Sequence, residues 1–263
     1  MTHSTPAGDD RDAEPMEAAV VRLTEPEIDS AERRRLLRRV VDTAGSGTRT
    51  GARRLVMGPK AVVQWAFDAL LDIAPHVPVR DLETLRRHHD GKTGDLLAAA
   101  LIRNASRVSL SIGAAGGGLA ALEWVAPPAL LTAPVLIAAE TVAIVAVEVK
   151  LIAELHEVYG VPVRGTATEK GSQLLGAWAQ RRGVTLHHPG RVSGAVLSIG
   201  VRKELRDRLV KRMGRNLTTI GPLLTGAVVA AELNRRASKV LGEAVRDDLR
   251  NNAASRPQLP PAD

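Results

Sequence analysis

The chain has 263 residues and a formal net charge of +7 at neutral pH, and 44% of its residues are hydrophobic. It contains no cysteine, which excludes disulfides, thiolate zinc sites and thiol nucleophiles. Only 2% of the residues are aromatic, so alanine, valine and leucine must build the core. Such small aliphatic side chains favour close helix packing, and helical periodicity dominates the sequence. We therefore predict an all-α multi-helix bundle.

Charge is distributed unevenly along the chain. Residues 1–30 carry eight acidic and two basic residues, whereas the remainder carries 34 basic and 21 acidic residues. An acidic segment on a basic body suggests an anionic partner for the body, and an ordinary solvated surface is the alternative. The first residues lack a basic start followed by an apolar run, so we expect no secretory signal and a cytoplasmic origin for the body.

Composition divides the chain into three expected parts. Residues 1–24 are polar and acidic without periodicity, which predicts disorder. Residues 25–253 should form one helical domain. Residues 254–263 form a proline-rich tail.

The first expected helices alternate with short breaks. A helix over about residues 26–43 has leucine and valine on one face and ends at the glycine-rich stretch 45–51. Its polar face carries four arginines: Arg34, Arg35, Arg38 and Arg39. A second helix is expected over 59–73, and a short third one follows Asp81.

The second half of the chain should also be helical. A fourth helix starts near Gly94 and enters an apolar block over 108–147. Later helices are expected over about 129–159, 167–182, 192–213 and 238–249, with a second apolar stretch over 217–231. Gly160 followed by Pro162 predicts the end of the 129–159 helix.

The apolar block predicts a helical hairpin that bends at Pro127 and Pro128. Its first arm, 108–122, is about 15 residues or roughly 22 Å long, against ~30 Å for a bilayer core. The stretch over 217–231 is equally short. The second arm is longer but contains Glu140, and a carboxylate at mid-span costs ~2.5 kcal/mol or more unless paired.

Basic residues mark both open ends of this hairpin. Arg103 and Arg107 precede the first arm, and Lys150 follows the second. Positive residues favour the cytoplasmic side of a membrane, so the hairpin could enter and leave from one face, spanning or re-entrant. A hairpin buried in a soluble fold, with its ends in water, fits the same pattern. The sequence leaves these alternatives open.

Small residues in the apolar stretches predict close helix packing. Gly113 and Gly117 have the GxxxG spacing that lets two helix backbones approach, and Gly118 lies beside them. Gly221, in the second apolar stretch, is a further candidate for helix packing. The spacing occurs in membrane pairs and in alanine-rich soluble bundles alike.

Three segments resemble the EcsC-like family of bacterial proteins. They are SLSIGAAGGGLAAL in the first arm, LIAELHEVYG at the end of the second, and the late TTIGPLLTGAVVAAELNRRASKVLG. The resemblance covers about residues 79–236. It implies a helical, membrane-associated protein with a connection to transport, and it brings no established chemistry to any residue.

Motifs for catalysis, cofactors and metals are lacking. The glycines at 116–118 fit G-x-G-x-x-A, but no crossover helix and second strand follow, so no dinucleotide site is expected. The stretch 45–51 lacks the lysine of a phosphate-binding loop. The histidine pairs His88-His89 and His187-His188 lack metal-ligand spacing. We therefore predict no cofactor and no metal.

Glu140 is the candidate buried carboxylate. It shares one flank of its helix with Glu148, eight residues later. We expect it to pair with Arg103 or Arg107 or to face solvent. A role in proton or ion handling is the functional alternative.

Basic helices suggest the partner. Besides the four arginines near the N-terminus, a second group comprises Arg202, Arg206, Lys211 and Arg212. Basic amphipathic helices bind anionic lipid headgroups. No nucleic-acid fold is recognisable and stacking aromatics are scarce, so nucleic acid is not the expected partner.

These observations predict a non-enzymatic, membrane-associated helical protein at the cytoplasmic face of the cell membrane. It would bind anionic lipid or a membrane protein such as a transporter. Two alternatives remain: a soluble helical enzyme with a pocket near Glu140, and a soluble adaptor that binds another protein. A purely cytoplasmic location goes with either alternative.

Overall fold

A computed structural model describes residues 15–46, 59–123, 133–182 and 223–254. Their elements in chain order are α1 (Met16–Leu23), α2 (Ser30–Ser46), α3 (Pro59–Ile73), the 3-10 turn η2 (Ala74–His76), α4 (Leu82–His88), α5 (Gly94–Glu123), α6 (Ala133–Val158), α7 (Ala167–Arg181) and α9 (Leu223–Ala254). No strand occurs in these residues, so the prediction of an all-α multi-helix bundle is confirmed.

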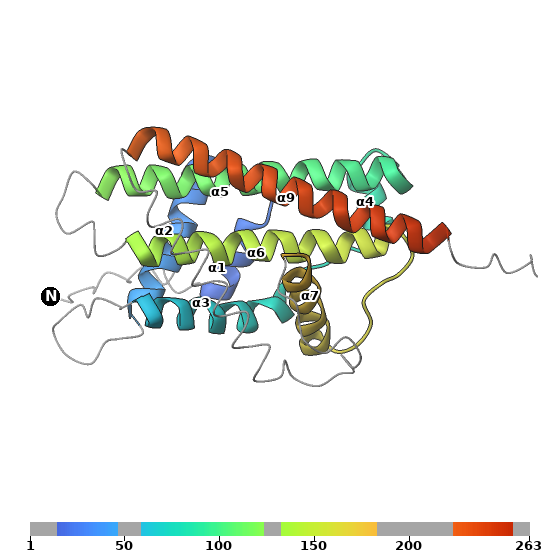
Figure 1. Cartoon of the computed structure of the whole chain (residues 1–263), viewed down its shortest axis with the longest axis horizontal. Coiled ribbons are helices and arrows are strands. Elements are labelled where there is room, and N and C mark those ends of the chain that lie inside the picture. Colours follow the sequence, from blue (N-terminus) through green and yellow to red (C-terminus); the bar gives the residue numbers. More distant parts are fainter. Residues whose placement is uncertain (1–14, 47–58, 124–132, 183–222, 255–263) are drawn as a thin grey trace, which may run out of the picture.

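Helix α6 is the central element of the bundle. It contacts all seven other α-helices of the described part of the chain. Every residue from Val142 to Leu155 is buried. A helix that is apolar on all sides must be covered on all sides. Figure 1 shows α5 and α9 running along α6, with α3 on the other side, α2 crossing behind α5 and α6, and α7 near the C-terminal end of α6.

The first helix differs from expectation. Disorder was predicted for residues 1–24, but Met16–Leu23 forms α1 and buries Ala19, Val20 and Leu23. The helix is only eight residues long, too short to show a convincing period in sequence. Its buried side chains make it part of the core.

Helix α9 joins two elements that were expected to be separate. The apolar stretch over 217–231 and the helix over 238–249 were predicted as distinct, but one helix runs from Leu223 to Ala254. Between them, the Glu232 carboxylate pairs with Arg235 and Arg236, three and four residues later. Such pairs stabilise a helix, so the polar interval continues it. The helix predicted over 192–213 lies outside the described residues.

Local signals explain the ends of α6 and α7. Gly160 has φ +67° and follows α6, and the Val161 amide donates to the His156 carbonyl at 2.8 Å. This left-handed glycine closes the helix as predicted. Helix α7 begins with a capping box between Thr166 and Glu169.

Candidate functional site

The predicted packing glycines of α5 face different neighbours. A Cβ added at Gly113 would lie 2.8 Å from Ala231 Cα of α9, so the two backbones touch there. Further along the same helix pair, a Cβ at Gly242 of α9 would lie 2.8 Å from Ile102 Cγ1 of α5. We call Gly113, Ala231, Gly242 and Ile102 the small-residue seam. It holds α5 and α9 at close range.

The other glycines have separate surroundings. A Cβ at Gly116 would lie 2.6 Å from Glu140 Oε2, so this glycine makes room for the carboxylate. A Cβ at Gly118 would lie 3.6 Å from Arg34 Cδ, which is ordinary contact. Gly117 is half-buried. Gly221 belongs to a stretch outside the described residues.

Glu140 of α6 faces Gly116 of α5 and Asn234 of α9. It is half-buried, and one of its oxygens accepts a hydrogen bond from Asn234 Nδ2 at 2.7 Å. Arg103 and Arg107, its expected partners, have exposed side chains. Glu140 therefore joins α6 to α9 through Asn234, an amide that the sequence did not suggest.

Glu148 is the fully buried carboxylate of the molecule's core, with 0% exposure. Its oxygens accept hydrogen bonds from the Ser238 hydroxyl of α9 at 2.8 Å and the Trp178 indole of α7 at 2.6 Å. Arg182 forms a salt bridge with it. Ser109 of α5 lies 2.8 Å from the Ser238 hydroxyl. This one carboxylate thus links three helices to α6.

Glu148 was not among the residues that the sequence predicted for a site. The only sequence signal for Glu148 was that it shares one flank of its helix with Glu140. Its partners come from residues 30 to 90 positions away in sequence, and that spacing has no pattern. Because a buried ion costs several kcal/mol unless it is paired, all these donors are needed to keep the charge inside.

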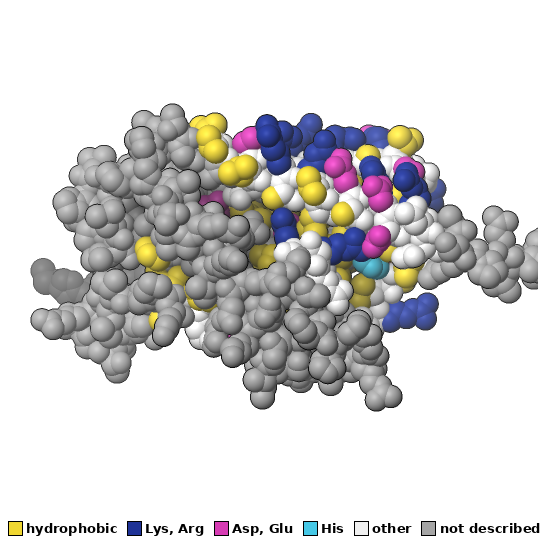
Figure 2. All heavy atoms as spheres, viewed as in Figure 1, with side chains coloured by type: hydrophobic (Ala, Val, Ile, Leu, Met, Phe, Trp, Pro, Cys, Tyr) yellow, Lys and Arg dark blue, Asp and Glu magenta, His cyan; other side chains and the backbone are white. Residues whose placement is uncertain are grey.

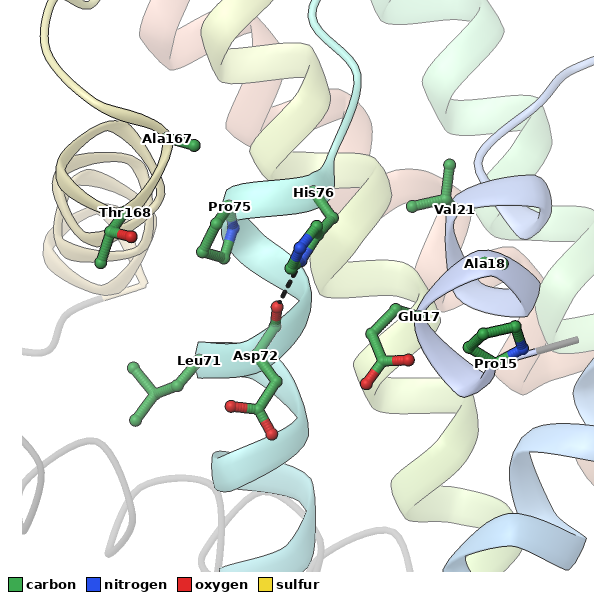
Figure 3. A pocket seen from close by; sticks show the side chains of 10 residues that line it. All are labelled: Pro15, Glu17, Ala18, Val21, Leu71, Asp72, Pro75, His76, Ala167 and Thr168. Atoms are coloured by element: carbon green, nitrogen blue, oxygen red, sulfur yellow. Dashed lines mark hydrogen bonds between the residues drawn. The ribbon is translucent and has the colours of Figure 1, made fainter.

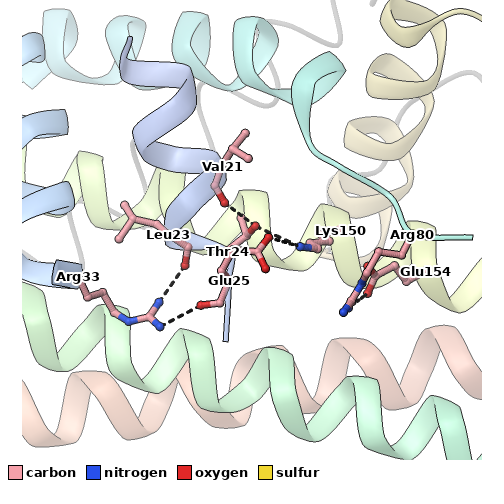
Figure 4. A network of polar contacts seen from close by, with 8 residues as sticks. All are labelled: Val21, Leu23, Thr24, Glu25, Arg33, Arg80, Lys150 and Glu154. Atoms are coloured by element: carbon pink, nitrogen blue, oxygen red, sulfur yellow. Dashed lines mark hydrogen bonds and ion pairs between the residues drawn. The ribbon is translucent and has the colours of Figure 1, made fainter. Parts of the chain in front are cut away.

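A second polar network ties α6 to the segments that follow α1 and η2 (Figure 4). Lys150 Nζ donates to Glu25 Oε1 at 2.9 Å, and Arg80 donates twice to the Glu154 carboxylate at 2.7 and 2.9 Å. Arg33 of α2 is buried and donates to the Leu23 carbonyl at 2.9 Å. Burial lowers the pKa of Arg33. Lys150 therefore lies inside the bundle, and it does not mark an open hairpin end.

The predicted arginines of α2 differ in exposure. Arg35 and Arg38 are exposed, and Arg34 and Arg39 are half-buried. In the described residues, no salt bridge involves Arg34, Arg35 or Arg38. The second predicted group, Arg202, Arg206, Lys211 and Arg212, lies outside the described residues.

Helices α5 and α9 share an outward surface that combines cations with apolar side chains (Figure 2). We call it the outer face. Its residues are Leu96, Arg103, Arg107 and Ala114 of α5, and Val228, Val229, Leu233, Arg236, Lys239 and Val240 of α9. The α5 residues recur at intervals of seven, four and seven, which places them on one stripe. Helix α2 also contacts α5, and Arg34 of α2 lies beside Gly118 of α5.

Acidic side chains offset part of this charge on α9. Hydrogen bonds from Arg235 and Arg236 hold the pKa of Glu232 at about 2, so it is ionised at neutral pH. Glu243 lies 3.7 Å from Lys239. No described acidic side chain forms a salt bridge with Arg103 or Arg107 of α5.

A groove of about 850 Å³ lies between α1, η2 and α7 (Figure 3). Pro15, Val21 and Leu71 line it together with the carboxylates of Glu17 and Asp72. His76 lies there too, with Nδ1 2.8 Å from the Asp72 carbonyl. A smaller cavity of about 30 Å³ adjoins Arg80 and Lys150. Glu140 lines neither.

The described histidines and carboxylates do not converge on a metal site. Among the described residues, no three histidine, aspartate or glutamate side chains could hold one ion. His89 lies near the Arg80–Glu154 pair, and its Nε2 is buried without a hydrogen-bond partner in the described part of the chain. Burial lowers the pKa of His89, and the charge of Arg80 adds to this effect.

The length and apolarity of the described helices bear on whether they could cross a bilayer. None of the helices in the described ranges combines the length and the apolarity that a transmembrane segment requires. Comparison with known proteins adds no assignment, because the chain matches no protein family, no curated protein and no solved structure. The EcsC-like resemblance therefore stays a prediction.

Proposed function

We propose that this protein binds the surface of a membrane that contains anionic lipid, at the cytoplasmic face of the cell membrane, and acts there without catalysing a reaction. The outer face carries this proposal. On it, exposed cations of α5 and α9 lie beside exposed valines and leucines. Surfaces with both features bind the boundary between headgroups and acyl chains.

Electrostatic attraction would come from arginines that form no salt bridge in the described residues: Arg34, Arg35, Arg38, Arg103 and Arg107. Each basic residue near an anionic surface contributes ~1 kcal/mol. Five such residues on adjoining helices give useful affinity without a deep pocket. The attraction acts over about one Debye length, so salt should weaken it.

Peripheral binding is compatible with the absence of a membrane-crossing helix from the described ranges. The EcsC-like resemblance also implies a membrane connection. A membrane protein such as a transporter is the natural additional partner under this proposal. An enzymatic site at Glu140 has less support, because the carboxylate is held by Asn234 and lines neither cavity.

Vesicle flotation tests the proposal. The full chain should float with vesicles containing phosphatidylglycerol and stay behind with pure phosphatidylcholine, and raised salt should reduce flotation. Equal flotation with both vesicle types, or none with either, would contradict it.

A matched pair of charge variants locates the binding. The double variant Arg103→Gln/Arg107→Gln removes two cations from the outer face. Arg164→Gln/Lys170→Gln removes two exposed cations at and just before α7, which packs mainly against η2 and α6. Binding should fall roughly tenfold or more in the first variant, at ~1 kcal/mol per cation. It should fall much less in the second, and equal losses would argue against a specific face.

A further inference from the structure

Helix α9 exposes an apolar stripe where a soluble helix would carry polar residues. Val229, Leu233 and Val240 are 57%, 59% and 64% exposed. Their spacing of four and seven residues places them along one line of the helix. The opposite side of α9 is buried through Ala231, Ser238 and Leu241. The exposed stripe is therefore additional to the face that packs into the bundle.

Charges around the stripe restrict what can cover it. Arg236 lies within the stripe, and Lys239 lies beside it. Arg103 and Arg107 belong to the neighbouring helix α5. Arg236 and Lys239 form salt bridges with Glu232 and Glu243, whereas Arg103 and Arg107 form none in the described residues, so the outer face keeps an excess of positive charge. A second copy of the chain docked face to face would bring two such net-positive faces together. The segment 183–222 carries eight basic and two acidic residues, so it would meet the same repulsion. Anionic lipid headgroups would pair with the cations, and lipid acyl chains would make apolar contact with the valines and the leucine.

We propose that the N-terminal half of α9 lies in the membrane plane and that Val229, Leu233 and Val240 enter the headgroup–acyl boundary. This inference rests on the proposed function and adds the orientation of the bound protein. Interfacial helices bury their apolar side roughly 5–10 Å into this boundary. The stripe would thus supply a part of the binding that salt does not screen.

Acidic side chains set the end of the inserted region. Beyond Val240 the helix carries Glu243, Asp247 and Asp248. Arg246 and Arg250 pair with Asp247 there, so these turns keep a net negative charge, whereas Arg235, Arg236 and Lys239 outnumber Glu232 before Val240. Anionic lipid should repel the net-negative C-terminal turns, which should therefore stay in water. Helix α9 would then be tilted relative to the membrane plane, with its N-terminal half inserted more deeply than its C-terminal end.

The absence of cysteine makes this orientation directly measurable. Single variants Leu233→Cys, Val240→Cys and Asn252→Cys can each be labelled with the environment-sensitive fluorophore NBD. Asn252 is exposed on the same helix and serves as the control. On phosphatidylglycerol vesicles, the labels at 233 and 240 should shift to shorter wavelength and become protected from aqueous iodide. The label at 252 should change little.

Flotation of the same labelled proteins separates the two proposals. Proteins that float without any spectral shift at 233 and 240 would overturn the insertion of α9 while leaving lipid binding intact. A shift at 252 equal to that at 233 would overturn the tilted orientation. Failure to float would contradict the proposed function and this inference with it.

Substitution gives a second test without a label. Leu233→Ser/Val240→Ser keeps every charge, and both side chains are exposed, so the melting temperature should hold. Its binding at high salt should be weakened about fivefold or more, because apolar contact with the membrane is lost. Unchanged high-salt binding by a folded variant would overturn the inference.

Discussion

Helices α6 and α9 reverse the usual relation between polarity and burial. Helix α6 holds Glu148, Lys150 and Glu154 inside the bundle, whereas α9 presents Val229 and Leu233 to solvent. Each buried charge of α6 has a partner from another helix or a connecting segment. The exposed valines of α9 are not covered by any part of the chain that the structure describes. The charges of α6 therefore serve internal architecture, and the apolar stripe of α9 is the part of the comparison that calls for an outside partner.

Loss of the Glu148 carboxylate should have the largest effect. Glu148→Ala should lower the unfolding free energy by about 3 kcal/mol or more, because Ser238, Trp178 and Arg182 lose a buried acceptor. Glu148→Gln retains an acceptor oxygen and should cost less. Urea unfolding followed by tryptophan fluorescence measures both. Equal stability of the alanine variant and the wild type would show that the network contributes little.

The small-residue seam between α5 and α9 should be the next most sensitive region. Gly113→Ala should cost about 1–3 kcal/mol, because its Cβ would meet the Ala231 backbone. Gly118→Ala is the matched control on the same helix, where the nearest atom is 3.6 Å away. That control should be neutral or stabilise by up to about 1 kcal/mol through helix propensity. Similar losses in both variants would mean that the close approach at Gly113 is not the cause of the loss.

Glu140 should matter less than Glu148, because it is only half-buried. Glu140→Gln fills the same space beside Gly116 and can still accept from Asn234, so the loss should be about 1 kcal/mol or less. Thermal melting measures stability, and complementation of a deletion phenotype measures function. A stable Glu140→Gln protein that fails to complement would favour the catalytic alternative.

Acidification should destabilise the protein through His89. Its pKa in the folded state is below the ordinary 6.5, so the unfolded chain binds a proton that the folded chain does not. Stability should therefore fall as the pH drops from about 6.5 toward the lowered pKa. Melting temperatures measured between pH 7.5 and 5.5 should fall less steeply in His89→Gln than in the wild type. Equal dependence of the melting temperature on pH in both proteins would show that His89 does not cause the loss of stability.

Substitutions in the outer face should change the free energy of unfolding least. Leu233→Ser should change the unfolding free energy by within about 0.5 kcal/mol, because the side chain is already 59% exposed. Urea unfolding checks this value. A loss as large as that of Gly113→Ala would show that Leu233 packs against the protein itself, and the stripe would then need no membrane to explain it.

Local sequence signals were sufficient for much of the secondary structure. The helix over 59–73 has the predicted bounds, and Asp81 caps α4 by accepting from the Thr84 amide. These features depend on residues within a few positions of one another. Helix α1 and the continuity of α9 were missed, because one helix is too short for a period and the other contains a polar interval.

Composition and periodicity by themselves determined the all-α class, the central apolar segment and several helix ends. Only the tertiary structure decided that Glu148, rather than Glu140, is the fully buried carboxylate, and which side of α9 faces outward. Apolar residues occur on both sides of α9, so its period cannot select the packed one. The close approach at Gly113 and Gly242 selects it, because only small residues there let α5 and α9 touch. That contact turns Ala231 and Ser238 inward and leaves Val229 and Leu233 exposed.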